Sequence, residues 1–219
     1  MSSLDPDKIE AELVAYYDGE GDHRLHRPIE PERVAARATF LRAISHGGPK
    51  SVLEIGSGPG RDARAFVEAG HRYVAVDLSF EHIRRCRAIT ARVARASVRR
   101  LPFRTASFDS IWTMSTLMHV PESAISQALS ELSRVLNPGG LAAIGVWGGR
   151  DVEERRSEDI LEGKPPRLFS RRSNERWRTM LTAVGDIEAF ETWGHEHDFF
   201  YQWALLRSEL RTQGRSMAG

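Results

Sequence analysis

The stretch VLEIGSGPGRD, from Val52 to Asp62, decides the fold. It begins as a short apolar run, passes through Gly56, Gly58 and Gly60, and leads into a helical pattern that ends at a further glycine, residue 70. This order predicts a strand, a glycine turn and a helix. Because a turn without side chains lets a ligand approach the backbone, the stretch predicts a ligand site at the carboxyl edge of an α/β sheet.

Apolar runs and helical patterns alternate along the rest of the chain, as in α/β folds built on a largely parallel sheet. Strands are expected at 51–55, 71–76, 92–98, 108–114, 141–147, 187–193 and 199–206. Helices are expected at 6–17, 31–45, from 63, from 80, between 121 and 136 and at 173–183, with a polar insertion at 148–166. The fold class is therefore α/β, and the last two strands fit a closing hairpin.

Asp77 ends the second expected strand, where a carboxylate can accept hydrogen bonds from both hydroxyl groups of a ribose. A dinucleotide site needs a glycine three positions after the second glycine of the turn, and that position holds Arg61. Glu54 would repel a pyrophosphate but would tolerate a ligand that carries an amino group and a sulfonium. The turn therefore favours a sulfonium nucleoside, and a turn that serves helix packing alone stays open as the alternative.

The 31 basic and 30 acidic side chains of the 219 residues nearly cancel, to a net charge of +1. This balance gives no overall reason to expect a polyanionic partner, so nucleic acid is not expected as one. The single cysteine, Cys86, excludes an intramolecular disulfide and a thiolate zinc cluster, which favours a reducing compartment. The chain shows no signal-peptide pattern and no apolar run of about 18 residues, so we expect a cytoplasmic protein outside the membrane.

Four stretches, in this order, resemble the small class I S-adenosylmethionine-dependent methyltransferases of the bacterial type: VLEIGSGPGRD at 52–62, YVAVDLS at 73–79, LPFRTASFDSIW at 101–112 and LSRVLNPGG at 132–140. The resemblance implies a Rossmann-like, seven-stranded, mostly parallel sheet in the order 3-2-1-4-5-7-6, with helices on both faces and the last inserted strand antiparallel. It also implies a single domain over 1–219, with an N-terminal helical cap or lid at 1–47, a cofactor-binding core at 48–147, and an insertion with the C-terminal hairpin at 148–219.

The resemblance implies S-adenosyl-L-methionine as the cofactor. The cofactor-binding residues expected from it are Tyr17, Glu54, Gly56, Ser57, Gly58, Gly60, Asp77, Leu78, Ser97, Val98 and Met114. In this assignment the glycines line the methionine portion, Asp77 holds the ribose, Leu78 covers one face of adenine, and Glu54 helps to orient the amino group. Tyr17 resembles the lid tyrosines of related enzymes, or is an ordinary residue at the edge of an amphipathic helix.

Ser97 is the clear departure from the family pattern. Such enzymes usually carry an acidic residue four positions before the LPF motif, where it accepts hydrogen from the adenine amino group. The Ser97 hydroxyl can accept the same hydrogen bond, and the backbone amide of Val98 can reach a ring nitrogen of adenine. We therefore expect binding to survive with a loss of about 1 kcal/mol.

His119, in the stretch MSTLMHVP after the fourth expected strand, is the predicted catalytic residue. Methyl transfer depends on alignment and desolvation more than on a triad or a metal, but an oxygen or nitrogen acceptor can need a base. His119 lies where the acceptor approaches in this family, although the same position can simply shape the loop. Ser115 and the region of Trp147 are expected near the chemistry, under covers formed around Tyr17 and by residues 148–169.

Two polar clusters invite other interpretations. Residues 195–198, HEHD, place two histidines on one side of a strand, but no third ligand is identifiable, so a polar hairpin turn and no metal are expected. The arginine-rich segment 84–104 lacks interleaved aromatic residues and is expected to be solvated surface.

The sequence predicts S-adenosylmethionine-dependent methyl transfer to a small-molecule acceptor, through an oxygen or nitrogen nucleophile of, for example, a specialised metabolite. Two alternatives stay open: a protein that binds adenosylmethionine without transfer activity, and an enzyme that methylates RNA or protein. Acceptor pockets in this architecture come from variable helices and insertions, so neither the acceptor nor the oligomeric state is predicted.

Overall fold

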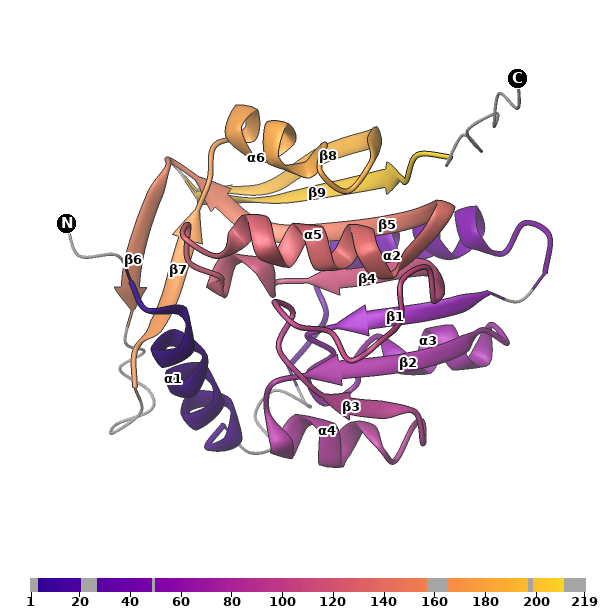
Figure 1. The fold of residues 1–219 in the computed structure, drawn as a ribbon, viewed down its shortest axis with the longest axis horizontal. Helices are drawn as coiled ribbons and strands as arrows, with labels where there is room; N and C mark the ends of the chain where they lie inside the picture. The colour runs from indigo at the N-terminus through magenta and orange to yellow at the C-terminus, as the bar shows by residue number, and fades with distance from the viewer. Residues whose placement is uncertain (1–3, 21–26, 49, 157–164, 197–198, 211–219) are drawn as a thin grey trace, which may run out of the picture.

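The computed structural model describes residues 4–20, 27–48, 50–156, 165–196 and 199–210, without the side chains of 195 and 196. Figure 1 shows a twisted central sheet with helices packed against it, and α1 (Pro6–Asp18) set at one end beside a separate pair of strands, β6 (Val152–Arg156) and β7 (Arg167–Arg171). No helix in these ranges is both long enough and apolar enough to span a membrane.

Seven strands form the main sheet in the order β3-β2-β1-β4-β5-β9-β8. Their bounds are β1 Ser51–Ile55, β2 Arg72–Asp77, β3 Val93–Arg95, β4 Phe108–Met114, β5 Leu136–Gly149, β8 Asp186–Glu196 and β9 Phe199–Arg207. The pairs from β3 to β5 are parallel, and β9 is antiparallel to both β5 and β8. Because β6 and β7 belong to a separate sheet, the order counted within the main sheet is 3-2-1-4-5-7-6, and the predicted topology is confirmed.

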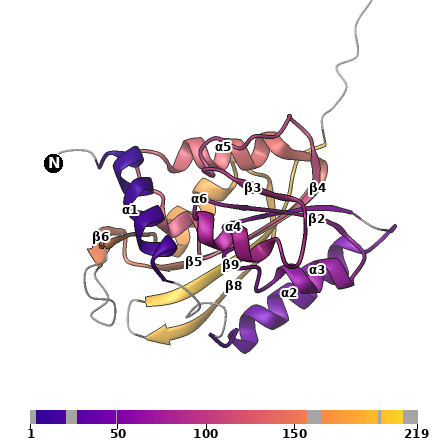
Figure 2. The ribbon, with the colours of Figure 1, turned by 90° about the horizontal axis from the view of Figure 1, so that it is seen from below.

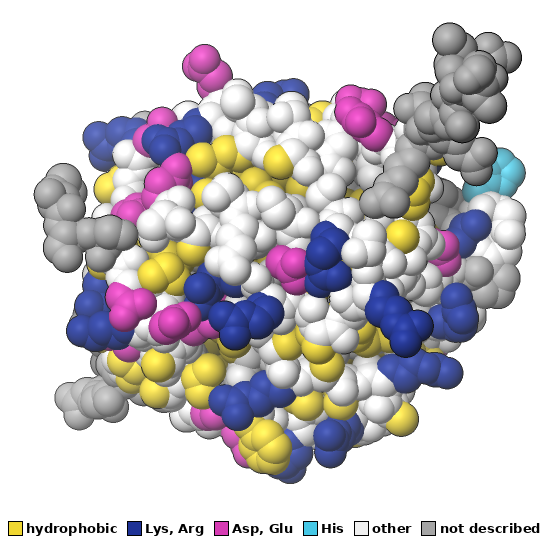
Figure 3. All heavy atoms as spheres, in the orientation of Figure 1, with side chains coloured by type: hydrophobic (Ala, Val, Ile, Leu, Met, Phe, Trp, Pro, Cys, Tyr) yellow, Lys and Arg dark blue, Asp and Glu magenta, His cyan; other side chains and the backbone are white. Residues whose placement is uncertain are grey.

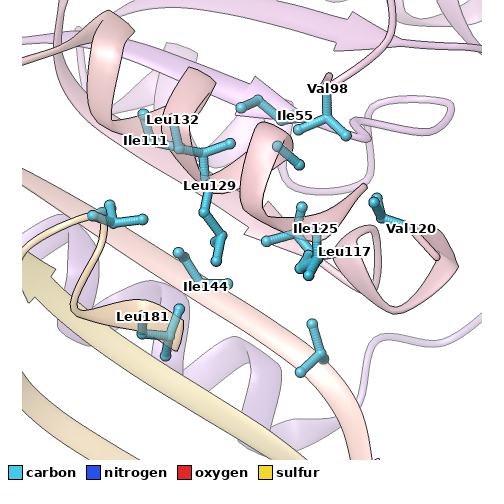
Figure 4. Close-up of a cluster of buried hydrophobic side chains, with 14 of the residues drawn as sticks. Ile55, Val98, Ile111, Leu117, Val120, Ile125, Leu129, Leu132, Ile144 and Leu181 are labelled. Atoms are coloured by element: carbon cyan, nitrogen blue, oxygen red, sulfur yellow. The ribbon is translucent and has the colours of Figure 1, made fainter. Parts of the chain in front are cut away.

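Two helices cover one face of the sheet, α5 (Ile125–Val135) and α6 (Asn174–Leu181). Leu129 and Leu132 of α5 and Leu181 of α6 are buried in one cluster with Ile111 of β4 and Ile144 of β5 (Figure 4). Complete burial of a leucine side chain contributes roughly 1.5–3 kcal/mol. This face therefore supplies much of the apolar burial that holds β4 and β5 in the centre of the sheet.

Three helices cover the opposite face, α2 (Pro31–Ile44), α3 (Ala63–Glu68) and α4 (Phe80–Cys86). Phe40, Phe66 and Cys86 from these helices share a second cluster with Trp112 of β4. Successive strand residues point to opposite faces, so Ile111 and Trp112 supply one side chain to each cluster. Figure 2 shows α5 on one side of the sheet and α2 and α3 on the other, which confirms the predicted helices on both faces.

The helix α1 belongs to neither helix layer. Its N-cap, Asp5, accepts a hydrogen bond from the backbone of Asp7, and Pro6 opens the first turn. Ile9 and Leu13 are buried against Leu168 of β7, and α1 also contacts α4. The helix therefore bridges the separate strand pair and the carboxyl edge of the main sheet.

The strand pair β6–β7 was not expected, and β6 lies within the polar insertion predicted at 148–166. The sequence of β6 is VEERR, and glutamate is disfavoured in strands. The residue types of β6 therefore do not predict a strand, although it forms an antiparallel ladder with β7. The third expected strand, 92–98, shortens to Val93–Arg95, because the Arg99 amide bonds to the Ser97 hydroxyl instead of to a neighbouring strand. The fifth begins early, at Leu136, with a register shift before the rest of the ladder with β4.

Candidate functional site

A cavity opens at the carboxyl ends of β1, β2 and β4, against α1. Its empty volume is about 740 Å³, which includes space open to solvent. Eight of the twelve predicted site residues line it, namely Tyr17, Gly56, Gly58, Asp77, Leu78, Val98, Met114 and His119. The other four, Glu54, Ser57, Gly60 and Ser97, are not among the lining residues in the described part of the chain.

The glycine turn presents backbone to this cavity. Gly56 and Gly58 have φ angles of +70° and +56°, in the left-handed region that favours glycine. A Cβ atom on Gly58 would meet no described atom within 4 Å, so the space beside it is open to a ligand. A Cβ atom on Gly56 would lie 1.9 Å from Oγ1 of Thr116, so Gly56 is needed for the close approach of the loop after β4.

Gly60 and Ser57 serve contacts within the protein. A Cβ atom on Gly60 would lie 2.8 Å from Cδ1 of Ile89, so this glycine lets the turn pack closely on the segment after α4. The hydroxyl of the buried Ser57 donates to the carbonyl of Gly58 at 3.3 Å. The structure brings neither residue to the cavity, because both face the packed interior behind the turn.

Asp77 joins the end of β2 to the glycine turn. Its Oδ2 accepts from the Gly58 amide at 2.7 Å, and its Oδ1 accepts from the Ser79 amide at 2.9 Å. Burial alone would raise the pKa of Asp77, but His82 and these two amides hold it below its ordinary value of 3.8. Oδ1 also lies 3.4 Å from Nδ1 of His82, whereas Oδ2 keeps a second lone pair, through which Asp77 can still accept a hydrogen bond from a ribose hydroxyl.

Glu54 lies behind the cavity. Its side chain is buried, and Oε2 accepts a hydrogen bond from the Tyr73 hydroxyl at 2.5 Å. Burial, together with the nearby charge of Asp62, raises the pKa of Glu54 well above its ordinary value of 4.5. Because Glu54 is bonded to Tyr73 behind the cavity wall, the structure does not bring it to the place beside a ligand amino group that the sequence predicted.

Ser97 is also turned away from the cavity. Its hydroxyl donates to Oε1 of Glu10 at 2.5 Å and accepts from the Arg99 amide at 3.0 Å. Glu10, Val98 and Arg99 line the cavity in its place. Sequence reasoning missed Glu10, although Glu10, Leu13 and Tyr17 stand at spacings of three and four, which put them on one face of a helix.

His119 ends a short 3₁₀ turn, Leu117–His119, and is buried at the cavity wall. Its Nδ1 lies 2.7 Å from the carbonyl oxygen of Leu168, and its Nε2 lies 2.9 Å from the Tyr17 hydroxyl. A carbonyl oxygen only accepts, so the hydrogen is on Nδ1 and the lone pair of Nε2 faces Tyr17. The imidazole therefore has the tautomer of a base whose acceptor nitrogen points to the cavity side.

Arg167, at the start of β7, fastens α1 over this histidine. Its guanidinium carbon lies 4.5 Å from the ring centre of Tyr16, and its Nη1 donates to the Tyr17 hydroxyl at 3.3 Å. Phe169 of the same strand stands edge-on to His119, with 5.0 Å between ring centres. The two parts of the predicted cover, the residues around Tyr17 and part of the segment 148–169, thus come together at His119. Residues 157–164 of that segment lie outside the described ranges.

The side of the cavity beyond β4 is formed by Met114 and Ser115. Ser115 has a φ angle of +60°, and its hydroxyl lies 3.1 Å from that of Tyr201 on β9. Burial raises the pKa of Tyr201 to about 12, so its hydroxyl stays protonated. Trp147 was also expected here, but it stacks on Phe199 at 4.5 Å between ring centres and does not line the cavity.

Of the arginines in the segment 84–104, Arg99 lines the cavity and the others do not. Within the described ranges no three His, Cys, Asp or Glu side chains are grouped to hold a metal, and residues 197 and 198 and the side chains of 195 and 196 fall outside the description. In the arginine-rich segment, Arg84 pairs with Glu81, and Arg99 pairs with Glu10. The face in Figure 3 carries basic and acidic side chains together, with basic ones gathered toward the part where β2, β3 and α4 lie.

Residues 52–140 match a protein family described as "Methyltransferase domain". A 2-methyl-6-phytyl-1,4-hydroquinone methyltransferase of Synechocystis sp. is 26% identical over 155 residues, which are 64% of this chain and 48% of that protein. A malonyl-[acyl-carrier protein] O-methyltransferase of Pseudescherichia vulneris is 35% identical over 117 residues, which are 52% of this chain and 46% of that protein. The chain thus spans about half the length of these relatives.

A solved structure shares the architecture over nearly the whole chain. The 1,6-didemethyltoxoflavin-N1-methyltransferase of Burkholderia thailandensis, determined with 1,6-didemethyltoxoflavin and S-adenosylhomocysteine bound, has a TM-score of 0.72 at 23% identity and covers 95% of this chain and 92% of its own. The strands β2 to β4, the glycine turn and Asp77 all lie in the part that matches the family. The fold is therefore that of the Rossmann-like class I methyltransferases, and its core at residues 52–140 matches the methyltransferase domain family.

Proposed function

We propose that this protein transfers a methyl group from S-adenosyl-L-methionine to an oxygen or nitrogen atom of a small molecule. The observation that carries the proposal is that one cavity is lined by the Gly58 turn, by Asp77 and by His119. The turn and the carboxylate suit a nucleoside with a charged amino acid tail, and the histidine suits an acceptor that loses a proton. The two requirements of the reaction therefore meet in one space.

The described residues fit the cofactor. The open space beside Gly58 admits close approach to the backbone, and Asp77 is a charged acceptor with a lone pair to spare. Gly56, Leu78, Val98 and Met114 complete the walls along β1 to β4. When bound, S-adenosyl-L-methionine would supply an electrophilic methyl carbon, so the protein has to provide alignment and exclusion of water.

His119 is proposed as the general base. Its hydrogen on Nδ1 stays with Leu168, and Nε2 takes the proton of the acceptor once the acceptor replaces the Tyr17 hydroxyl there. Arg167 and Tyr17 hold the cover that keeps water from this nitrogen. A space covered by α1 suits a small acceptor. We include a cytoplasmic location in the proposal because the single cysteine favours a reducing compartment.

The proposal is tested in two steps with the full chain. Calorimetric titration with S-adenosylhomocysteine is expected to give saturable binding, and absence of binding would overturn the proposal. Incubation with methyl-labelled S-adenosylmethionine and sets of phenols, carboxylic acids and amines is then expected to move label into the small-molecule fraction. Binding without transfer to any acceptor would favour a non-catalytic role, and label in added RNA or protein would favour a macromolecular acceptor.

A further inference from the structure

Glu10 brings a carboxylate from α1 to the part of the cavity where the base of a bound nucleoside has to lie. Gly58 follows β1, Asp77 ends β2, and Ala96 and Val98 follow β3 at the outer edge of the sheet. A ligand whose amino acid tail meets β1 and whose ribose meets β2 therefore extends its base over the end of β3. Glu10 lines the cavity there, together with Ala96 and Val98.

The carboxylate of Glu10 is held by one oxygen. Oε1 accepts from the Ser97 hydroxyl at 2.5 Å and from Nε of Arg99 at 2.7 Å. Oε2 has no hydrogen-bond partner among the residues that the structure describes. The side chain keeps about a fifth of its surface exposed at the cavity. One oxygen is thus fixed by the protein while the other is available to a ligand.

Ser97 cannot take the same part. Its single hydrogen is donated to Glu10, one of its lone pairs accepts from the Arg99 amide, and its side chain does not line the cavity. An exocyclic amino group carries only donors in its ordinary pairing, and an ionised carboxylate only accepts. The residue that matches such an amino group is therefore Glu10, with Ser97 and Arg99 as positioning residues.

We propose that Glu10, carried by α1, accepts a hydrogen bond from the 6-amino group of the adenine and so replaces the acidic residue that is missing at position 97. The inference rests on the proposed use of S-adenosylmethionine. It makes α1 part of the recognition of the base, because the carboxylate reaches the cavity only when α1 is docked. The same helix carries Tyr17 to His119, so base recognition and closure of the reaction space depend on one element.

The test compares S-adenosylhomocysteine with S-inosylhomocysteine, in which an oxo group replaces the 6-amino group, by calorimetric titration of the full chain. Hydrogen bonds to charged groups are worth about 1.5–3 kcal/mol, which corresponds to roughly 10- to 100-fold in affinity. Glu10→Ala is expected to lower the affinity for S-adenosylhomocysteine by this factor. It is also expected to reduce the adenosyl-to-inosyl preference at least about tenfold, because the loss falls on the amino group alone.

A second substitution distinguishes recognition of the adenine amino group by a carboxylate from attachment of α1 to the rest of the protein. In Glu10→Ala the side chain at position 97 loses the partner that turns it away from the cavity, so adding Ser97→Asp is expected to supply a carboxylate from the β3 side and to restore the adenosyl preference without the contact of α1. Lys8→Ala is the control, because Lys8 is exposed on the same helix and does not line the cavity, and it is expected to leave the preference unchanged. Asp7→Ala removes the other partner of Arg99 and is likewise expected to leave the preference unchanged.

An unchanged adenosyl preference in Glu10→Ala, with S-adenosylhomocysteine still bound, overturns the inference and leaves the proposed function standing. Failure of the parent protein to bind S-adenosylhomocysteine overturns the proposed function itself. If Glu10→Ala does not fold, Glu10→Gln keeps the size of the side chain, and its amide can serve either the amino or the oxo group. The preference is then expected to fall in Glu10→Gln, and a preference equal to that of the parent overturns the inference.

Discussion

The hydroxyl group of Tyr17 lies 2.9 Å from Nε2 of His119 and joins the N-terminal helix to the loop after β4. Since Nδ1 of the same ring faces the carbonyl oxygen of Leu168, Tyr17 donates and Nε2 accepts. The docked helix therefore covers the lone pair that a base would use. In the proposed reaction, an acceptor molecule has to take the place of this hydroxyl before it can give up a proton.

Replacement of His119 should separate catalysis from cofactor binding. His119→Asn is expected to lower turnover roughly 100- to 1,000-fold, the usual contribution of a general base, while the dissociation constant of S-adenosylhomocysteine changes less than about threefold. Tyr17→Phe, which keeps the ring but removes the hydroxyl, is the comparison and should retain turnover within about tenfold. Turnover by His119→Asn at the parental rate would assign this residue to loop structure alone.

Removal of the Asp77 carboxylate should weaken the cofactor product. Asp77→Ala is expected to cost about 1.5–3 kcal/mol of S-adenosylhomocysteine binding, because hydrogen bonds to a charged acceptor are lost. Asp109→Ala is the control, since Asp109 also accepts from a backbone amide, that of Ser51, but lies outside the cavity. Equal affinities of Asp77→Ala and the parent in calorimetry would remove Asp77 from the ribose site.

Two glycines of the turn should respond differently to alanine. Gly58→Ala places a methyl group in open space at a φ angle of +56°, so we expect a backbone penalty of about 1–2 kcal/mol and loss of ligand binding. Gly56→Ala would bring Cβ to 1.9 Å from Thr116, so we expect the larger loss of folding stability there. Urea unfolding and calorimetric titration of both variants measure the two effects, and the reverse order of stabilities would contradict the described turn.

Asp62 should be one of the main electrostatic contributors to stability. Its buried carboxylate binds Arg33 and Arg37 of α2 and the indole of Trp112. Burial would raise the pKa of Asp62, but these partners hold it below its ordinary value of 3.8. Its stabilising contribution is therefore complete above pH 3.8 and is lost as the pH falls through the lower value in the folded state.

Asp62→Asn is expected to lower the free energy of unfolding by about 3–5 kcal/mol at pH 7, because it leaves buried arginine charge without its counter-charge. The difference from the parent should shrink below pH 3.8. Glu68→Gln, which removes an exposed partner of Arg64, is the control and should change stability by less than about 1 kcal/mol. A difference independent of pH in urea unfolding would show that Asp62 does not act through its charge.

The contribution of Glu54 to folding stability should depend on pH in the opposite direction from that of Asp62. Because the pKa of Glu54 in the folded state is raised above 4.5, the folded state loses stability as the pH rises from 4.5 toward that higher value. Glu54→Gln removes this loss, so its stability relative to the parent is expected to increase as the pH rises above 4.5. Since Glu54 does not line the cavity, affinity for S-adenosylhomocysteine should change less than about threefold, and a tenfold loss would return Glu54 to the ligand site.

The helices and strands whose apolar residues recur at a regular spacing were predictable from the sequence. Alternation in β4 and the apolar face of α5 follow from side-chain geometry that is local to each element, and the glycine turn has few other uses between a strand and a helix. The pair β6–β7 was not predictable, because the charged residues of β6 are stabilised by a ladder with a strand that lies beyond the next loop. Tertiary pairing there overrides the preference of the residues.

Within the site, several predicted residues at or after the ends of strands line the cavity, among them Asp77 and His119. The predicted residues that do not line the cavity are held by contacts elsewhere in the fold. Glu54 bonds to Tyr73 across β1 and β2, and Ser97 is drawn to Glu10, some 87 positions earlier in the chain. Such partners depend on which segments meet in three dimensions, so neither could be found from the spacing around the motif.

The contacts of α1 have a consequence for the order of events during synthesis. Tyr17 and Glu12 leave the ribosome early, whereas Arg167 and Arg155, to which they bind, are made about 150 and 143 residues later. At translation rates of roughly 5–20 residues per second, the helix waits on the order of ten seconds for its docking strand. The sheet from β1 to β5 has by then been synthesised, so the ligand edge stands open on the nascent chain. The proposed reaction site can therefore be closed by α1 only after β7 has been made. A chain whose synthesis stops before residue 167 would have the glycine turn and Asp77 but could not dock α1 through Arg167.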